Sequence, residues 1–316
     1  MTVYIIKRLF IIIPLIIGIS IVVFFISHLI PGSAMEIFMG TQVEATQEQI
    51  EELKKIFGED KPLIIRYVDW IKDLIKGDFG VSLRTSRKVL PDILARLPLT
   101  LELTILSLSL AILIGIPIGI YAALKHSPLT SLTVRVVSLL GLSIPQFWLA
   151  TMLIIFFAKY LHISDIGNFV SFSEDPIANL KAMFLPSISM AVGMASVLVR
   201  FTRTSMLEVL SSDYIRTARS KGLSENIVLK KHALKNALLP VITIIGFYAG
   251  YLLGGAIVIE EIFALPGIGR LMLYAIEKRD YPVIQGTVIV VAILFIFINL
   301  IVDILYGIID PRIRYE

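Results

Sequence analysis

The chain has 316 residues, of which 56% are apolar and 17% charged, and its mean hydropathy is +0.85. A soluble domain of this length would carry more charge and interrupt its apolar runs sooner, so the composition predicts an integral membrane protein. The chain has no cysteine, which excludes disulfides, thiolate nucleophiles and Cys-ligated metals. The net charge of +4 comes from basic blocks beside apolar segments, which is typical of a membrane surface and not of a nucleic-acid groove.

Six apolar segments are long enough to cross a hydrocarbon core of about 30 Å. The first follows Lys7 and Arg8, and it is longer than the apolar core of a cleavable signal peptide, so we expect it to be retained. The fourth is the shortest. The predicted spans are residues 9–30, 99–124, 134–158, 184–199, 238–259 and 283–309. We therefore predict an all-α integral membrane protein with six transmembrane helices.

Lysine and arginine are unevenly distributed over the short connections between these spans. They gather before the first span, between the second and third, after the sixth and, above all, between the fourth and fifth. Because short cytoplasmic loops are enriched in Lys and Arg, we predict that both termini lie in the cytoplasm. The densest block contains Arg200, Arg203, Arg216, Arg219, Lys221, Lys230, Lys231 and Lys235.

The long connection after the first span is expected to form a small extracytoplasmic cap. Apolar residues at helical spacing predict helices over residues 46–57 and 62–76, and the second should end at residues 77–80, which contain two glycines. The cap either rests passively on the bundle or takes part in function. The expected domains are a tail and first helix at 1–30, the cap at 31–98, and a five-helix core at 99–316 with a cytoplasmic loop at 200–237.

Small residues within the spans mark sites of close helix packing. Gly115 and Gly119 share one face of the second span, and glycines at 246, 250 and 254 share a face of the fifth. They could serve packing within the chain or contact with a second membrane subunit. The ionisable residues nearest to span interiors are Glu102 and Asp303, and an interfacial position is favoured over a transport role for both.

The most informative segment is the basic loop between the fourth and fifth spans. Asp213 can cap a helix N-terminus, Gly222 can adopt the left-handed conformation that ends one, and Lys221 would lie in the last turn. This pattern predicts a rigid helix of about two turns, which could contact lipid or a protein partner. Pro240 is then expected in the first turn of the fifth span, where its missing N–H costs little.

Residues 214–222 and 232–240 resemble the cytoplasmic coupling loop of ABC-importer permeases, most closely that of the B-type subunit in the dipeptide, oligopeptide and nickel family. Arg216 stands where the general motif of this loop has a glutamate. The resemblance extends along essentially the whole chain. Further matching segments are residues 4–8, 31–32, 77–80, 96–102, 143–147, 261–269 and 310–312.

The resemblance implies the type I ABC-importer permease fold, with a short helix that docks in a groove of an ATPase subunit. It also implies a second homologous permease, two ATPase subunits and an extracytoplasmic substrate-binding protein in the cell membrane, surrounded by lipid and without nucleic acid. Small peptides are the implied substrate, and nickel complexes or other small solutes remain open. The residues assigned to the ATPase contact are Asp213, Tyr214, Ile215, Arg216, Thr217, Ala218, Arg219, Lys221 and Gly222.

The outer segment from residue 260 to residue 270 is a second candidate site. It is expected either to contact the binding protein or form an external gate, or to be a tight re-entrant turn held by its proline and glycines. The residues assigned to the contact are Glu260, Glu261, Phe263, Pro266, Gly267 and Arg270.

The chain is not expected to be an enzyme. It contains no GxxxxGK[ST] phosphate loop, so ATP and Mg²⁺ are expected on partner ATPases, with no cofactor or metal on this chain. The four histidines form no HExxH motif. An ATP-independent secondary transporter or channel is the main alternative, but it would be expected to place charged groups near mid-span or to show inverted repeats.

Overall fold

The computed structural model describes residues 2–29, 60–125, 127–162 and 169–309, and their regular structure is helical. Five helices are long and apolar enough to cross a membrane, and a bent pair brings the number to as many as six. The spans start with α1 (Thr2–Leu29), α5 (Val89–Leu124) and the pair α6 (Pro128–Ser143) and α7 (Gln146–Leu161). They continue with α8 (Pro176–Leu210), α11 (Leu234–Ile262) and α13 (Tyr281–Ile309).

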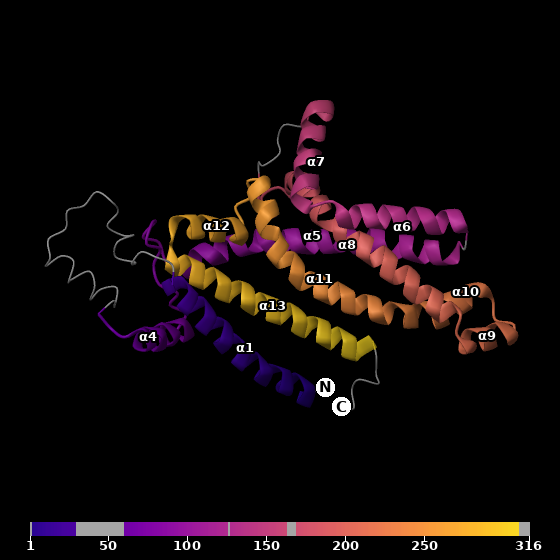
Figure 1. Ribbon diagram of the computed structural model, residues 1–316, viewed down its shortest axis with the longest axis horizontal. Coiled ribbons are helices and arrows are strands. Elements are labelled where there is room, and N and C mark those ends of the chain that lie inside the picture. The colour runs from indigo at the N-terminus through magenta and orange to yellow at the C-terminus, as the bar shows by residue number, and fades with distance from the viewer. Residues whose placement is uncertain (1, 30–59, 126, 163–168, 310–316) are drawn as a thin grey trace. The chain divides into compact units, whose positions relative to one another are not determined.

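The expectation of one continuous helix over residues 134–158 is wrong. Helices α6 and α7 meet at an angle of 95°, and Figure 1 shows α7 turned away from the direction of α6. The break falls at Ile144 and Pro145, whose backbones are extended, with ψ of 119° and 135°. Proline cannot donate the next helical hydrogen bond and disfavours helical geometry in the residue before it, so α6 ends here and α7 restarts.

Two further expectations about helix ends are corrected. The fourth span is not short: α8 begins well before residue 184, because Asp175 caps it by accepting hydrogen bonds from the amides of Ile177 and Ala178 at 3.0 Å. Pro240 does not lie in a first turn. It lies inside α11, which follows directly on α10 (Glu225–Ile227) and the π-helical turn η1 (Val228–Ala233).

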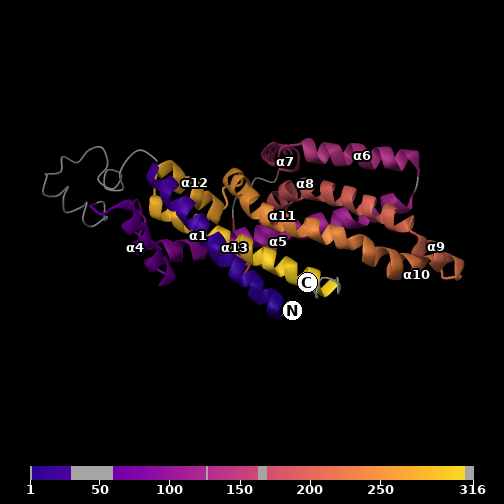
Figure 2. The same ribbon diagram turned by 60° about the horizontal axis from the view of Figure 1, so that its bottom comes forward.

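One compact unit contains residues 99–265 together with the C-terminal part of α13. Its core is centred on α8, whose Met183, Met190, Met194 and Leu198 are fully buried. Helices α6, α7 and α11 pack against α8. Figure 1 shows where these helices lie, and α6 runs beside α8 in the turned view of Figure 2. This unit positions the basic loop.

Glycine allows α5 to approach α8 closely within this unit. A Cβ atom built at Gly115 would lie 2.6 Å from the Leu198 Cβ, and one at Gly119 would lie 2.6 Å from the Thr202 Cβ. Gly246 likewise faces Val302, whereas a Cβ at Gly254 would meet no atom within 4 Å. The structure therefore assigns Gly115, Gly119 and Gly246 to packing within the chain.

The second unit contains residues 6–98 and 266–296 and is held by its own apolar cluster. It includes α4 (Leu63–Ile75) and α12 (Ile268–Lys278). Helix α4 confirms the prediction for residues 62–76, and Gly77 follows it with a φ of +82°. The predicted helix over 46–57 lies outside the described residues, as does the side chain of Asp303. The proposed domain boundaries remain predictions.

Candidate functional site

A short helix, α9 (Asp213–Ser220), follows the end of α8 after a tight turn. The residue at its N-cap position is Ser212, so the expectation that Asp213 caps the helix is wrong by one position. The Ser212 hydroxyl instead donates to the Val209 carbonyl at 2.6 Å, which ties the turn back to α8. Asp213 becomes the first helical residue, where its negative charge interacts favourably with the helix dipole.

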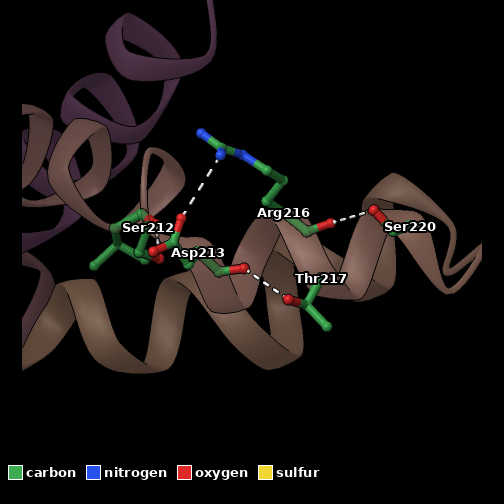
Figure 3. A network of polar contacts seen from close by, with 6 residues as sticks. Ser212, Asp213, Arg216, Thr217 and Ser220 are labelled. Carbon is green, nitrogen blue, oxygen red and sulfur yellow. Dashed lines mark hydrogen bonds and ion pairs between the residues drawn. The ribbon is translucent and has the colours of Figure 1, made fainter.

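Polar contacts along α9 run from one turn to the next (Figure 3). The Arg216 guanidinium lies 3.7 Å from the Asp213 carboxylate. The Thr217 hydroxyl donates to the Asp213 carbonyl at 2.9 Å, and the Ser220 hydroxyl donates to the Arg216 carbonyl at 3.0 Å. These are local contacts on an exposed surface, so they order the helix and contribute little to global stability.

The opposite face of α9 is anchored in an apolar cluster. Ile215 is fully buried and Ala218 is 7% exposed. The residues around them come from α5, α8, η1 and α11 and are Ala123, Met206, Val228, Ala233 and Ala237. Because these side chains surround Ile215 from several elements, α9 is packed closely against the ends of the long helices.

The exposed face is predominantly polar and partly held in place. Arg219 donates two hydrogen bonds to the Glu225 carboxylate, at 2.7 and 3.2 Å, and these bonds raise the pKa of Arg219 above its usual value. The Asn236 side-chain amide donates to the Tyr214 hydroxyl at 2.9 Å. Tyr214 is 44% exposed, so its ring is presented outward with its hydroxyl fixed. Tyrosine and arginine, which are both present on this face, are enriched at protein–protein contacts.

The left-handed end of the helix was correctly expected from the sequence. Gly222 has a φ of +76°, and Lys221 is the C-cap residue just after the last turn. All the residues assigned to this contact lie within one segment, and Ile215 and Ala218 form its buried side. The sequence patterns did not single out three further residues of this site, which are Ser212, Glu225 and Asn236. Serine, glutamate and asparagine are typical of helix caps and side-chain contacts, but only the fold shows which partner each residue takes.

The outer segment divides into buried and exposed residues. Glu260 is fully buried and accepts a hydrogen bond from the Thr100 hydroxyl at 2.6 Å, and its carbonyl accepts one from the Leu265 amide at 2.8 Å. Phe263 is buried as well, and Ala264 has a φ of +54°. This part of the segment is therefore a tight turn with a buried carboxylate at its base.

The rest of the segment leads into α12. Gly267 occupies the N-cap position of this helix and is buried, Arg270 is half-buried, and Glu261 and Pro266 are exposed. Whether these residues contact a partner or gate a path stays a prediction.

Glu102 lies in α5 and accepts a hydrogen bond from the Asn179 amide of α8 at 3.3 Å. The same Asn179 amide donates to the Val170 carbonyl at 2.9 Å, so the pair ties the start of α8 to α5 and to the preceding loop. Among the described side chains, no group of three or more His, Cys, Asp or Glu residues could hold a metal ion.

Comparison with protein families gives two matches that together span nearly the whole chain. Residues 115–315 match the family described as the binding-protein-dependent transport system inner membrane component. Residues 1–104 match the N-terminal region of membrane components of such systems.

Similar individual proteins cover the full length. A dipeptide transport system permease protein of Alkalihalophilus pseudofirmus is 42% identical, with 100% of each chain covered. A putative peptide transport system permease protein of Brucella abortus is 40% identical over 100% of each chain, and the dipeptide transport system permease protein of Escherichia coli K12 is 38% identical over 99% of each. Among solved structures, the MetNI methionine ABC transporter in an inward-facing form matches with a TM-score of 0.56 at 20% identity, covering 69% of this chain and 96% of that chain.

Proposed function

The chain belongs to the family of binding-protein-dependent transport system inner membrane components, and from that premise we propose that it is one permease subunit of an ATP-driven importer of small peptides. It is a multi-pass membrane protein with the fold of type I ABC-importer permeases. Its partners in this proposal are a second homologous permease, two ATPase subunits that hold ATP and Mg²⁺, and an extracytoplasmic binding protein. Both termini would lie in the cytoplasm.

The peptide substrate is supported by the relatives, whose names specify dipeptide or peptide transport at 38–42% identity. Nickel complexes or other small solutes are the alternative cargo. A channel is disfavoured, because the family is described as a component of transport systems that depend on a binding protein. An ATP-independent secondary transporter stays the second alternative.

The observation that carries the proposal is the construction of α9. One side is locked into the apolar cluster around Ile215, and the other presents Tyr214, Arg216 and Thr217 outward. In the proposed mechanism, the exposed face sits in a groove of an ATPase subunit. When the ATPases bind ATP and close, that groove moves. Because α9 is rigidly anchored, the motion is transmitted to α8 and α11 and is not absorbed by a flexible loop.

The outer segment is proposed to act at the opposite face of the membrane. Glu261 and Pro266 are exposed and are our candidates for contact with the binding protein, while Glu260 and Phe263 hold the shape of the turn from within. Crosslinks from position 261 to a binding protein would support this assignment. If only residues 60–98 gave such crosslinks, the assignment would be wrong.

The coupling role is tested with the purified complex reconstituted in liposomes. The Arg216 side chain is 79% exposed, so Arg216→Glu should reverse its charge without disturbing the fold. The ATPase subunits should then bind less tightly. We expect ATP-driven uptake of a labelled dipeptide to fall at least about tenfold, which corresponds to about 1.4 kcal/mol of lost interaction. Lys181→Glu, at the other end of α8, is the matched control and should keep normal uptake.

A second variant tests the buried side of the helix. Ala218→Asp places a carboxylate in the apolar cluster, where it has no partner, so α9 should detach from the bundle. The expected result is ATP hydrolysis without peptide uptake. Undiminished uptake in both variants would refute the coupling role.

A further inference from the structure

A cavity of about 560 Å³ lies in the first unit, where the break between α6 and α7 faces α8 and α11. Its volume falls within the range of about 300–1,000 Å³ that is typical of small-molecule sites. The side chains that matter most for its chemistry are Gln146, Met194, Phe247, Tyr248, Tyr251 and Leu252. The lining of this cavity includes no residue of α9 or of the outer segment 260–270.

The break in the third span creates the space. Pro145 turns the chain away from α6, and Gln146 begins α7 at the corner. Glycines at positions 141, 193 and 255 also line the wall. A Cβ at Gly255 would lie 3.5 Å from the Gln146 Oε1, so glycine at this position leaves the side-chain amide accessible from the cavity.

The lining combines aromatic rings with uncharged polar groups. The rings of Tyr248 and Tyr251 meet edge to face, with centroids 5.7 Å apart, and Phe247 meets Tyr248 at the same distance. Within the described part of the chain, no hydrogen bond is made by the Gln146 amide or by either of the two tyrosine hydroxyls, and no charged side chain lines the cavity. Polar groups in a spanning segment are costly unless water or a ligand satisfies them.

We propose that this cavity is a peptide-binding stretch of the translocation path, in which Gln146 and Tyr251 hydrogen-bond the peptide backbone. The inference rests on the proposed function and adds the residues that contact the cargo. A side-chain amide and a phenol both donate and accept, so together they match the N–H and C=O groups that all peptides share. Aromatic walls accommodate varied apolar side chains, and the absence of charge keeps binding weak enough for release.

A second cavity in the same unit contrasts with this one. It has a volume of about 340 Å³, lies between α5, α6 and α8, and is lined largely by aliphatic side chains such as Leu110, Ile114 and Val137. It offers a peptide backbone only a few hydroxyl groups, among them Ser138 and Ser196. The polar cavity is therefore the one suited to the proposed cargo.

The experiment uses the complete complex in liposomes with its binding protein, and measures both peptide uptake and stimulated ATP hydrolysis. Gly255→Leu fills the cavity and should lower dipeptide uptake at least about tenfold while ATP hydrolysis continues. Gly255→Ala is the matched control, because its single methyl group lies 3.5 Å from the Gln146 Oε1, an ordinary van der Waals distance, and leaves most of the cavity open, so uptake should stay close to that of wild type. Normal uptake in Gly255→Leu would overturn the proposal.

A second measurement detects backbone recognition even if the filled variant fails to fold. Uptake of a dipeptide is compared with uptake of its ester analogue, which lacks the amide N–H, in wild type, Gln146→Leu and Tyr251→Phe. The wild-type complex should take up the dipeptide faster than its ester analogue. Loss of one hydrogen bond should reduce this preference about three- to tenfold in at least one of the two variants. The same binding protein is used with wild type and both variants, so its own preference between the dipeptide and the ester cancels when the complexes are compared.

An unchanged preference in both variants would overturn the assignment of these side chains to the backbone. A wild-type complex without any ATP-dependent peptide uptake would refute the proposed function itself, and this inference with it. The two failures are distinguished by the wild-type measurement alone.

Discussion

Gly222 ends α9 with a φ of +76°, and a Cβ built there would meet no atom within 4 Å. The glycine is therefore required by backbone conformation and not by crowding. Gly222→Ala would impose a left-handed conformation on an L-residue, at a cost of about 1–2 kcal/mol. We expect the end of α9 to loosen, with a several-fold loss of ATP-driven uptake in the reconstituted complex.

Gly77 offers a matched control for this prediction. It follows α4 with a φ of +82° and equally open surroundings, so Gly77→Ala carries the same local cost outside the coupling region. Uptake should be close to that of wild type. Equal losses in the two variants would mean that the Gly222 effect is one of general stability and not of coupling.

At this scale the sequence predicts conformation better than it predicts partners. The left-handed Gly222 could be inferred because glycine after a capped helical pattern is a local signal. The helix start was misplaced by one residue, because Ser212 and Asp213 are both good N-cap residues and their order in the chain does not decide between them. The burial of Glu260 could not be inferred, since its partner Thr100 is 160 residues away in the sequence.

At the scale of elements, proline shows what hydropathy alone cannot resolve. Pro145 breaks a span, whereas Pro186 and Pro240 lie inside continuous helices. The local sequence signal is the same in all three cases, and all three lie in apolar surroundings. The difference depends on what packs against each proline, because neighbouring helices and local adjustments can satisfy the freed carbonyl in a span.

Close packing between α5 and α8 gives a prediction for element stability. A leucine at 119 would bring its Cβ to 2.8 Å from the Val199 carbonyl oxygen, so the backbones must separate. Overpacking of this kind costs about 1–3 kcal/mol, and Gly119→Leu should lower the thermal stability of the protein in detergent. Gly18→Leu on α1, where a Cβ meets no atom within 4 Å, should leave the melting temperature nearly unchanged.

The start of α4 should respond to pH. Lys61 donates a hydrogen bond to the Asp69 carboxylate at 2.9 Å, and this bond holds the pKa of Asp69 below its usual value of 3.8. A carboxylate with a lowered pKa stabilises the folded state above its unfolded pKa, and this contribution is lost as the pH falls through the lowered value. Hydrogen exchange over residues 62–69 should therefore be slower in wild type than in Asp69→Asn at pH 6. The difference should disappear near pH 2, and a difference that persists there would contradict this account.

At the scale of the whole molecule, the bent pair decides the topology. Five helices could each cross the membrane, and α6 with α7 could make a sixth crossing. Six crossings place both termini on one side, which agrees with the Lys and Arg distribution of the short loops. With the N-terminus inside, five crossings would instead place the basic loop around α9 outside the cell, away from any ATPase. The sequence predicts six spans but cannot show whether a chain that turns by 95° still crosses.

The absence of cysteine makes this question directly testable, because any single introduced thiol is the only one in the chain. Ser173 lies between α7 and α8, Lys230 lies in η1, and both are exposed. With six crossings, a membrane-impermeant maleimide added to right-side-out vesicles should label Ser173→Cys but not Lys230→Cys, and inside-out vesicles should give the reverse. If α6 and α7 together fail to cross while the N-terminus is inside, the two labelling patterns exchange. That exchange would place α9 outside and remove the basis for its coupling role.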